Sequence, residues 1–246
     1  MVDWAVARNT TKHLHEYCKS LSTPLAFPSF GEGGELLLII TYTMESLNSI
    51  LLTRLTHFNL SELTELYKRA GSATAVIEHK RDIREILPEA STHLIQALKD
   101  IDSLREWAEQ ELEYDRLHNI EPICMNDERY PQRLKECPDA PILLYYLGNA
   151  DLNNRHVINI IGTRHCTTYG QDIIHSFVRE LKVLCPDVLI LSGLAYGVDI
   201  HAHRAALENG FETVGVLAHG LDDIYPRGHR DTALKMIKQG GLLSEY

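Results

Sequence analysis

The sequence predicts an α/β protein in which a small helical domain precedes a doubly wound, mostly parallel sheet. Two observations lead to this fold class. From His156 onward, short runs rich in Val, Ile and Leu alternate with single helical segments, and parallel strands need such crossover connections. Between residues 44 and 118, apolar residues instead recur three and four positions apart, which is the helical period.

Residues 1–43 do not share either pattern. The stretch "LSTPLAFPSFGEGGE" mixes Pro, Gly and Ser without helical or strand periodicity. We therefore expect residues 1–43 to be a poorly ordered or non-native extension, with Met44 as the natural start.

Residues 44–118 carry the helical period. Apolar residues are spaced for helices in "LNSILLTRL", "LSELTELYKRAG" and "ATAVIEHK", and Gly71 is a stop signal. A further helical stretch runs from Ser91 to about His118, with Ser91 as its expected N-cap. These segments predict one small helical domain.

Residues 119–246 carry the strand patterns. The apolar run in "PILLYYLGN" is followed by strands predicted at 157–162, 188–193, 213–220 and 241–246, and by helices at about 170–184, 200–208 and 230–238. No helix follows the last strand in the sequence given, so we expect this domain to be incomplete at its C-terminus, and its uncovered strand to favour association.

Composition limits the classes of partner. The formal net charge is −10. Residues 151–246 contain 9 Lys and Arg against 11 Asp and Glu, a balance of −2, which leaves −8 for residues 1–150. A net negative charge repels the phosphate backbone, which argues against non-specific nucleic-acid binding. An anionic partner therefore needs a local basic site.

The cysteines and the hydropathy of the sequence indicate in which cellular compartment the protein works. The five cysteines include no C-x-x-C pair, which favours free thiols over a disulfide framework or zinc site. The apolar run "LLLII" is too short to span a bilayer. We expect a soluble, cytoplasmic protein without a membrane partner.

The predicted strands end in loops with unusual composition. They read "GTRHCTTYG", "SGLAYGVD", "AHGLDDIYPRGHR" and "SEY", and parallel strands bring such loops to one edge of the sheet, where ligands bind. Glycines let the backbone approach a ligand, and the helix N-termini that follow attract anions. The glycines concerned are Gly162, Gly193, Gly197 and Gly220.

Arginines on this edge favour a phosphate ligand. Arg164 offers a guanidinium fork for bidentate contact, and Arg227 and Arg230 follow on the same rim. The alternative is structural, with Arg164 paired to Asp199 or Asp222. The three loop tyrosines Tyr169, Tyr196 and Tyr225 likewise have two interpretations, as platforms for stacked bases or as loop packing.

Cofactor and metal sites are not expected. The loop "GTRHCTTYG" lacks the G-x-G-x-x-G spacing of dinucleotide sites, and no G-x-x-x-x-G-K-[ST] motif occurs. His201 and His203 should open a helix, where positions i and i+2 point about 200° apart and cannot share one ion. We expect His203 to pack or hydrogen-bond beneath the Gly-rich loop, and Asp199 to cap the helix. No catalytic nucleophile is apparent.

Residues 128–246 resemble the DNA-processing protein A family (DprA/Smf). The resemblance lies in "YPQRLKECPDAPILLYYLGN", "IIGTRHCTTYG", "LSGLAYGVDIHAHRAAL", "GLDDIYP" and "LLSEY", in this order and at the family's spacing. The segment from about Leu47 to Leu87 is similar, more weakly, to the family's helical domain of the helix-hairpin-helix or SAM-like type. The family continues beyond "SEY", so the resemblance implies a C-terminally truncated chain.

The resemblance implies a non-enzymatic, cytoplasmic protein that binds single-stranded DNA through a Rossmann-like domain. It also implies a dimer at full length and a role in natural transformation and recombination, loading RecA recombinase onto incoming DNA. The resemblance and the loop chemistry together predict DNA contacts from Gly162, Thr163, Arg164, Ser192, Gly193, Tyr196, Gly197, Gly220, Tyr225, Arg227 and Arg230, with Asp199, His203 and Pro226 as supports.

The sequence departs from the family at some positions. Tyr196 replaces a common Lys or Arg, His219 a small residue and His229 an Asn, and "THFNLSE" at residues 56–62 lacks the family's Gly-rich hairpin. Two other functions remain open. One is a Rossmann-like enzyme of the nucleoside-phosphate hydrolase type, whose Pro-Gly-Gly and downstream Glu motif is missing; the other is a protein-binding scaffold.

Overall fold

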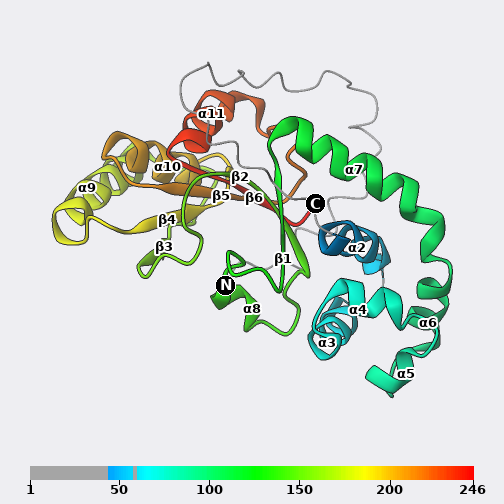
Figure 1. The fold of residues 1–246 in the computed structure, drawn as a ribbon. Coiled ribbons are helices and arrows are strands. Elements are labelled where there is room, and N and C mark those ends of the chain that lie inside the picture. Colours follow the sequence, from blue (N-terminus) through cyan, green and yellow to red (C-terminus); the bar gives the residue numbers. More distant parts are fainter. Residues whose placement is uncertain (1–43, 58–59) are drawn as a thin grey trace. The chain divides into compact units, whose positions relative to one another are not determined.

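The structure is a computed structural model that describes residues 44–57 and 60–246 (Figure 1). These residues form two compact units, 44–145 and 146–246. The predicted extension, residues 1–43, lies outside the described residues. The α/β class with a helical N-terminal part is confirmed, whereas the predicted domain boundary at residue 119 stays a prediction.

The first unit is mainly helical. Its core is made of fully buried aliphatic side chains, such as Ile50, Leu66 and Leu98. Along the chain it contains α2 (Met44–Thr53), η1 (Arg54–His57), α3 (Leu60–Ala70), α4 (Ala73–Glu78), α5 (Ile83–Ile86), α6 (Thr92–Lys99), η2 (Ile101–Leu104), α7 (Arg105–His118), β1 (Glu121–Cys124) and α8 (Gln132–Lys135).

The helical stretch predicted from Ser91 to His118 is interrupted. The Ser91 N-cap is confirmed, because its hydroxyl accepts a hydrogen bond from the Leu94 N–H at 3.2 Å. At Asp100, however, α6 ends and the 3₁₀ helix η2 begins. The Ser103 hydroxyl donates to the Asp100 carbonyl at 2.7 Å, and such local bonds compete with the α-helical ladder. Ile101 is fully buried at this break.

The sheet has six strands in the order β1-β2-β6-β5-β4-β3. Strands β3 to β6 are parallel, with Val157 opposite Leu189, Ile190 opposite Thr213, and Thr213 opposite Gly240. The later strands are β2 (Leu143–Gly148), β3 (Val157–Asn159), β4 (Leu189–Ser192), β5 (Thr213–Leu217) and β6 (Gly240–Ser244). Strand β3 is shorter than the predicted 157–162, so its last residues belong to the loop that follows.

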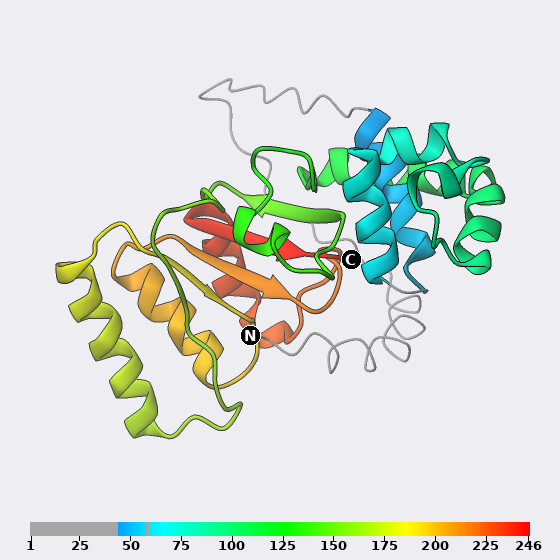
Figure 2. The same ribbon diagram turned by 90° about the horizontal axis from the view of Figure 1, so that it is seen from below.

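Single helices connect the parallel strands, as predicted. They are α9 (Thr168–Leu184), α10 (Val198–Glu208) and α11 (Arg230–Lys238), the last preceded by η3 (Arg227–His229). Helix α10 packs against both α9 and α11, and Figures 1 and 2 show α9 and α10 side by side along the strands. Because every crossover moves one strand in the same direction, right-handed connections place the three helices in one layer.

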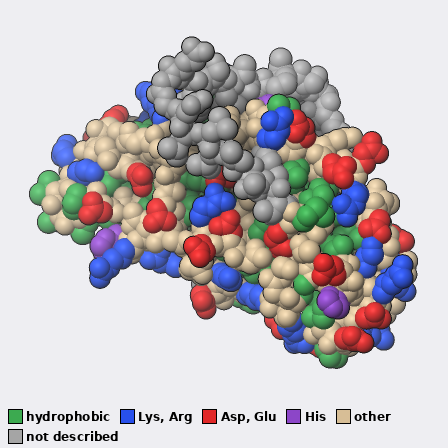
Figure 3. Space-filling model, viewed as in Figure 1, with side chains coloured by type: hydrophobic (Ala, Val, Ile, Leu, Met, Phe, Trp, Pro, Cys, Tyr) green, Lys and Arg blue, Asp and Glu red, His purple; other side chains and the backbone are tan. Residues whose placement is uncertain are grey.

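One face of the described part shows charges of both signs. On the face drawn in Figure 3, Lys and Arg side chains are interspersed with Asp and Glu. The cysteines of the described part, Cys124, Cys137, Cys166 and Cys185, are free thiols. Among the helices of the described residues, none has the length and apolar character needed to traverse a bilayer.

Candidate nucleic-acid interface

Most of the predicted DNA contacts lie in loops at one edge of the sheet, whereas Ser192 ends β4, Arg227 lies in η3 and Arg230 begins α11. The predicted supports Asp199 and His203 lie in α10. Because β3, β4, β5 and β6 are parallel, their carboxyl ends meet at this edge. The loops between the elements are residues 160–167, 193–197 and 218–226, and residues 245–246 follow β6. We call these four segments the strand-end loops.

The first two strand-end loops are joined through their backbones. The Val198 N–H donates to the Thr163 carbonyl at 3.1 Å. Gly197 has φ +80°, and a Cβ at this position would lie 2.1 Å from the Thr163 oxygen. Only glycine fits this conformation and this close approach. Gly197 therefore holds the loop that carries Arg164 against the start of α10.

The Asp199 carboxylate connects the same loops. It accepts hydrogen bonds from the backbone N–H groups of Gly162 and Ala195, while the Ser192 hydroxyl donates to the Ile160 carbonyl at 2.6 Å. Burial raises the pKa of Asp199, and these hydrogen bonds and the charge of Arg164 lower it in part. The predicted capping of α10 by Asp199 is wrong, because Gly197 is the N-cap and no side chain caps this end.

His203 supports the loop after β4 from below, as expected. Its Nε2 lies 2.7 Å from the Gly193 carbonyl oxygen, and its Nδ1 lies 2.8 Å from the Thr213 hydroxyl. Burial lowers the pKa of His203 to about 4, so the ring is neutral at pH 7 and Nε2–H donates to Gly193. His201 contacts the His175 ring edgewise instead, so the two histidines of "DIHAH" do not face one ligand.

Further polar contacts extend the edge to β5 and β6. The buried His229 ring places Nδ1 2.7 Å from the Leu194 carbonyl oxygen and packs edgewise against the Tyr196 ring. The Ser244 hydroxyl at the end of β6 donates to the His219 carbonyl at 2.7 Å. The strand-end loops are thus linked one to the next. His219 and His229 are contact residues that were not among the predicted site residues, although both fall in a predicted loop.

The three tyrosines predicted in loops are largely exposed, and the structure places Tyr169 in the first turn of α9 rather than in a loop. Tyr169 is 74% exposed, Tyr196 53% and Tyr225 64%, so packing leaves more than half of each side chain available to a ligand. Tyr225 precedes Pro226 through a cis peptide bond. These exposures favour the interpretation as stacking platforms over the interpretation as loop packing.

The arginines of the edge differ in their partners. Within residues 44–57 and 60–246, Arg164 forms no ion pair with Asp199, Asp222 or any other side chain, and Arg230 forms none either. Arg227 lies 4.0 Å from the Asp223 carboxylate, with both side chains largely exposed. Arg164 is itself exposed. Two guanidinium groups are therefore free to contact an anion.

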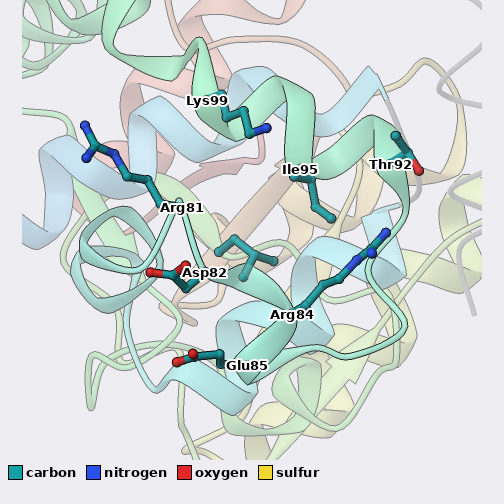
Figure 4. A pocket seen from close by; sticks show the side chains of 8 residues that line it. Arg81, Asp82, Arg84, Glu85, Thr92, Ile95 and Lys99 are labelled. Carbon is teal, nitrogen blue, oxygen red and sulfur yellow. The ribbon is translucent and has the colours of Figure 1, made fainter.

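No cluster of metal ligands competes with this edge in the described part of the chain. There, no three His, Cys, Asp or Glu side chains gather so as to hold a metal ion. A pocket in the helical unit, lined from α5 and α6, places Arg81, Arg84 and Lys99 among Asp82 and Glu85 (Figure 4). Its mixed charges do not define one class of ligand.

The family of the chain follows from its second half. The family model described as DNA recombination-mediator protein A matches residues 121–246, which is just over half of the 246 residues. The chain belongs to this family. The matched region contains all four strand-end loops, so the candidate interface lies wholly in the part that the family defines.

Several members of the DNA recombination-mediator protein A family are similar in sequence. DNA processing protein DprA of Streptococcus pneumoniae is 38% identical over 120 residues, which are 49% of this chain and 42% of the relative. DNA processing protein DprA of Bacillus subtilis is 35% identical over 132 residues, 53% of this chain and 44% of the relative. Protein Smf of Escherichia coli is 33% identical over 161 residues, 65% and 41% of the two chains.

The fold is also similar to a solved member of the family. The X-ray structure of DprA from Streptococcus pneumoniae aligns with a TM-score of 0.65 at 26% sequence identity, covering 81% of this chain and 67% of that chain. The chain spans less than half the length of each of these three curated relatives.

Proposed function

We propose that this protein binds single-stranded DNA in DNA processing and assists recombination on it without catalysing a reaction. More specifically, it helps to load RecA recombinase onto DNA taken up in natural transformation. It works in the cytoplasm, and at full length it acts as a homodimer. The strand-end loops are the DNA site, with the predicted residues from Gly162 to Arg230 in their proposed contact and support roles.

One observation carries the proposal, namely unpaired arginines beside exposed tyrosines on one sheet edge. Guanidinium groups bind phosphate in a bidentate manner, and aromatic rings stack unpaired bases at about 1–3 kcal/mol each. Arg164 and Arg230 supply the first chemistry, and Tyr196 and Tyr225 supply the second. Bases inside a duplex cannot stack on such rings, so the combination favours single strands.

Family membership and the names of the relatives support a role in DNA processing. The matched family is described as a recombination mediator, and two of the curated relatives are DNA processing proteins by name. These descriptions agree with a site that binds DNA at a sheet edge.

A nucleoside-phosphate hydrolase is the alternative from another class. Such an enzyme needs a carboxylate free to act at the sugar. The Asp199 carboxylate at this edge is instead buried and accepts hydrogen bonds from two backbone N–H groups. Release of a free base from a nucleotide would favour the enzyme, and a lack of salt-sensitive DNA affinity would favour the protein-binding scaffold.

Arg164→Ala tests the proposed site by fluorescence anisotropy with a labelled single-stranded oligonucleotide. A charge-assisted hydrogen bond contributes about 1.5–3 kcal/mol, so the affinity should fall roughly tenfold or more. The slope of log affinity against log salt should flatten by about 0.7 for each lost phosphate contact. Lys238→Ala is the matched control, since it removes an equal charge from the C-terminal end of α11, away from the strand-end loops.

The outcome distinguishes DNA contact from a structural role. A DNA contact lowers affinity and slope while the melting temperature stays the same. A lowered melting temperature with an unchanged slope would show that Arg164 stabilises the fold and does not contact DNA.

A further inference from the structure

His219 has a hydrogen-bonding environment that a neutral imidazole cannot satisfy. Its Nδ1 lies 2.8 Å from the Gly220 carbonyl oxygen, and its Nε2 lies 3.3 Å from the Tyr225 carbonyl oxygen. Both partners are backbone carbonyls, which only accept hydrogen bonds. A neutral ring has one N–H, whereas the imidazolium has two. The geometry therefore matches the protonated ring.

The ring closes the loop that presents two of the proposed DNA contacts. Gly220 and Tyr225 lie at the two ends of the segment that the ring bridges, and Arg227 follows after Pro226. The backbone of His219 is anchored to the sheet by the Ser244 hydroxyl, which also accepts from the Tyr246 N–H at 3.1 Å. The ring thus connects Tyr225, which is 64% exposed, to the end of β6.

Charged groups of both signs lie on the segments next to the ring. Asp222 and Asp223 lie in the same loop, with an Asp222 carboxylate oxygen beside Gly220. Glu245 follows β6, together with the phenol of Tyr246. Arg227 is the opposing cation, and it lies 4.0 Å from Asp223.

We propose that His219 is a positioning residue for the strand-end loops that couples DNA binding to proton uptake. As the imidazolium, it donates both N–H groups and holds Tyr225 and Arg227 in the arrangement described. Loss of the proton releases one end of the bridge and removes a positive charge from the edge. The inference rests on the proposed DNA-binding function and concerns the regulation of that same site.

The test is a pH profile of affinity. We would titrate the whole chain with a labelled single-stranded thymidine 20-mer at constant ionic strength, from pH 5.5 to 8.5, the range in which histidines change charge. Thymine has no group that titrates there. Binding of one ligand, here the proton, typically changes the affinity for a second ligand about 5- to 150-fold. We therefore expect wild-type DNA affinity to fall about fivefold or more from pH 5.5 to 8.5.

Three variants separate positioning by the imidazolium from a merely structural role. His219→Ala and His219→Gln should bind with a flatter profile, at the affinity that the wild type has at pH 8.5. His156→Ala removes a histidine that precedes β3, at the opposite edge, and should keep the wild-type profile. A pH profile that is the same in the wild type and in His219→Ala would overturn the inference.

A second measurement does not depend on the variants or on DNA. The ¹⁵N chemical shifts of the His219 ring in the free wild-type chain at pH 6 should show both nitrogens protonated. One protonated and one bare nitrogen at pH 6 would refute the double-donor arrangement. A chain that binds no DNA at any pH refutes the proposed function, whereas binding with an unaltered profile refutes only the role of His219.

Discussion

Gly197→Ala should destabilise the protein far more than a typical glycine substitution in a loop. Gly197 has φ +80°, and holding an alanine in such a conformation costs of order 1–3 kcal/mol. The new Cβ would also lie 2.1 Å from the Thr163 oxygen and 2.6 Å from the Arg164 carbonyl carbon. These are backbone atoms, so relief requires the loop to move and to lose the Val198–Thr163 hydrogen bond, about 0.5–1.5 kcal/mol.

Gly210→Ala is the matched control. Gly210 has φ +70°, but nothing lies within 4 Å of an added Cβ. Its replacement by alanine therefore costs only the free energy of holding a positive φ, about 1–2 kcal/mol. The two variants should therefore differ by at least about 1 kcal/mol in urea unfolding followed by circular dichroism, with Gly197→Ala the less stable. DNA affinity should fall in Gly197→Ala alone, because the displaced loop carries Arg164. Equal losses of stability in both variants would refute the close approach.

Two further predictions concern the helical unit. The pKa of Asp115 is raised to about 8 by burial and by the Glu111 carboxylate. Since folding then takes up a proton between about pH 4 and pH 8, the free energy of unfolding should fall as the pH rises through this window. Asp115→Asn should remove that slope in pH-dependent denaturation, and an unchanged slope would contradict the assignment. The Glu45 carboxylate accepts from the N–H groups of Ala73 and Thr74 at 2.7 and 3.0 Å. Glu45→Gln should therefore lower stability by about 1.5–3 kcal/mol, and Glu109→Gln, at an exposed position, should not.

Periodicity predicted the architecture well, because it reports burial. Runs such as "VLILSG" become buried strands, and the strand-end loops follow at the predicted places. The same runs could not tell which helix covers which face, since that depends on strand order. The break at Asp100 was also missed, because the local hydrogen bond from Ser103 to the Asp100 carbonyl leaves no mark on an otherwise continuous helical pattern.

The candidate site was predicted as a set of residues but not as a set of contacts. Glycines and arginines in the loops were readable from the sequence. The partners of Asp199 were not, because Gly162 and Ala195 reach it only once β3 and β4 are paired. For the same reason, His219 and His229 gave no local signal of their contacts with loop carbonyls.

The carboxylate of Asp199 has a consequence for how fast a ligand leaves. It ties Gly162 and Ala195 to the start of α10, so the first two loops are rigidified before any ligand arrives. The conformational entropy of these loops is then lost on folding and not on binding. A smaller part of the free energy of the contacts is therefore offset when a ligand binds. Oligonucleotides of different sequence should consequently associate at similar rates and differ mainly in residence time.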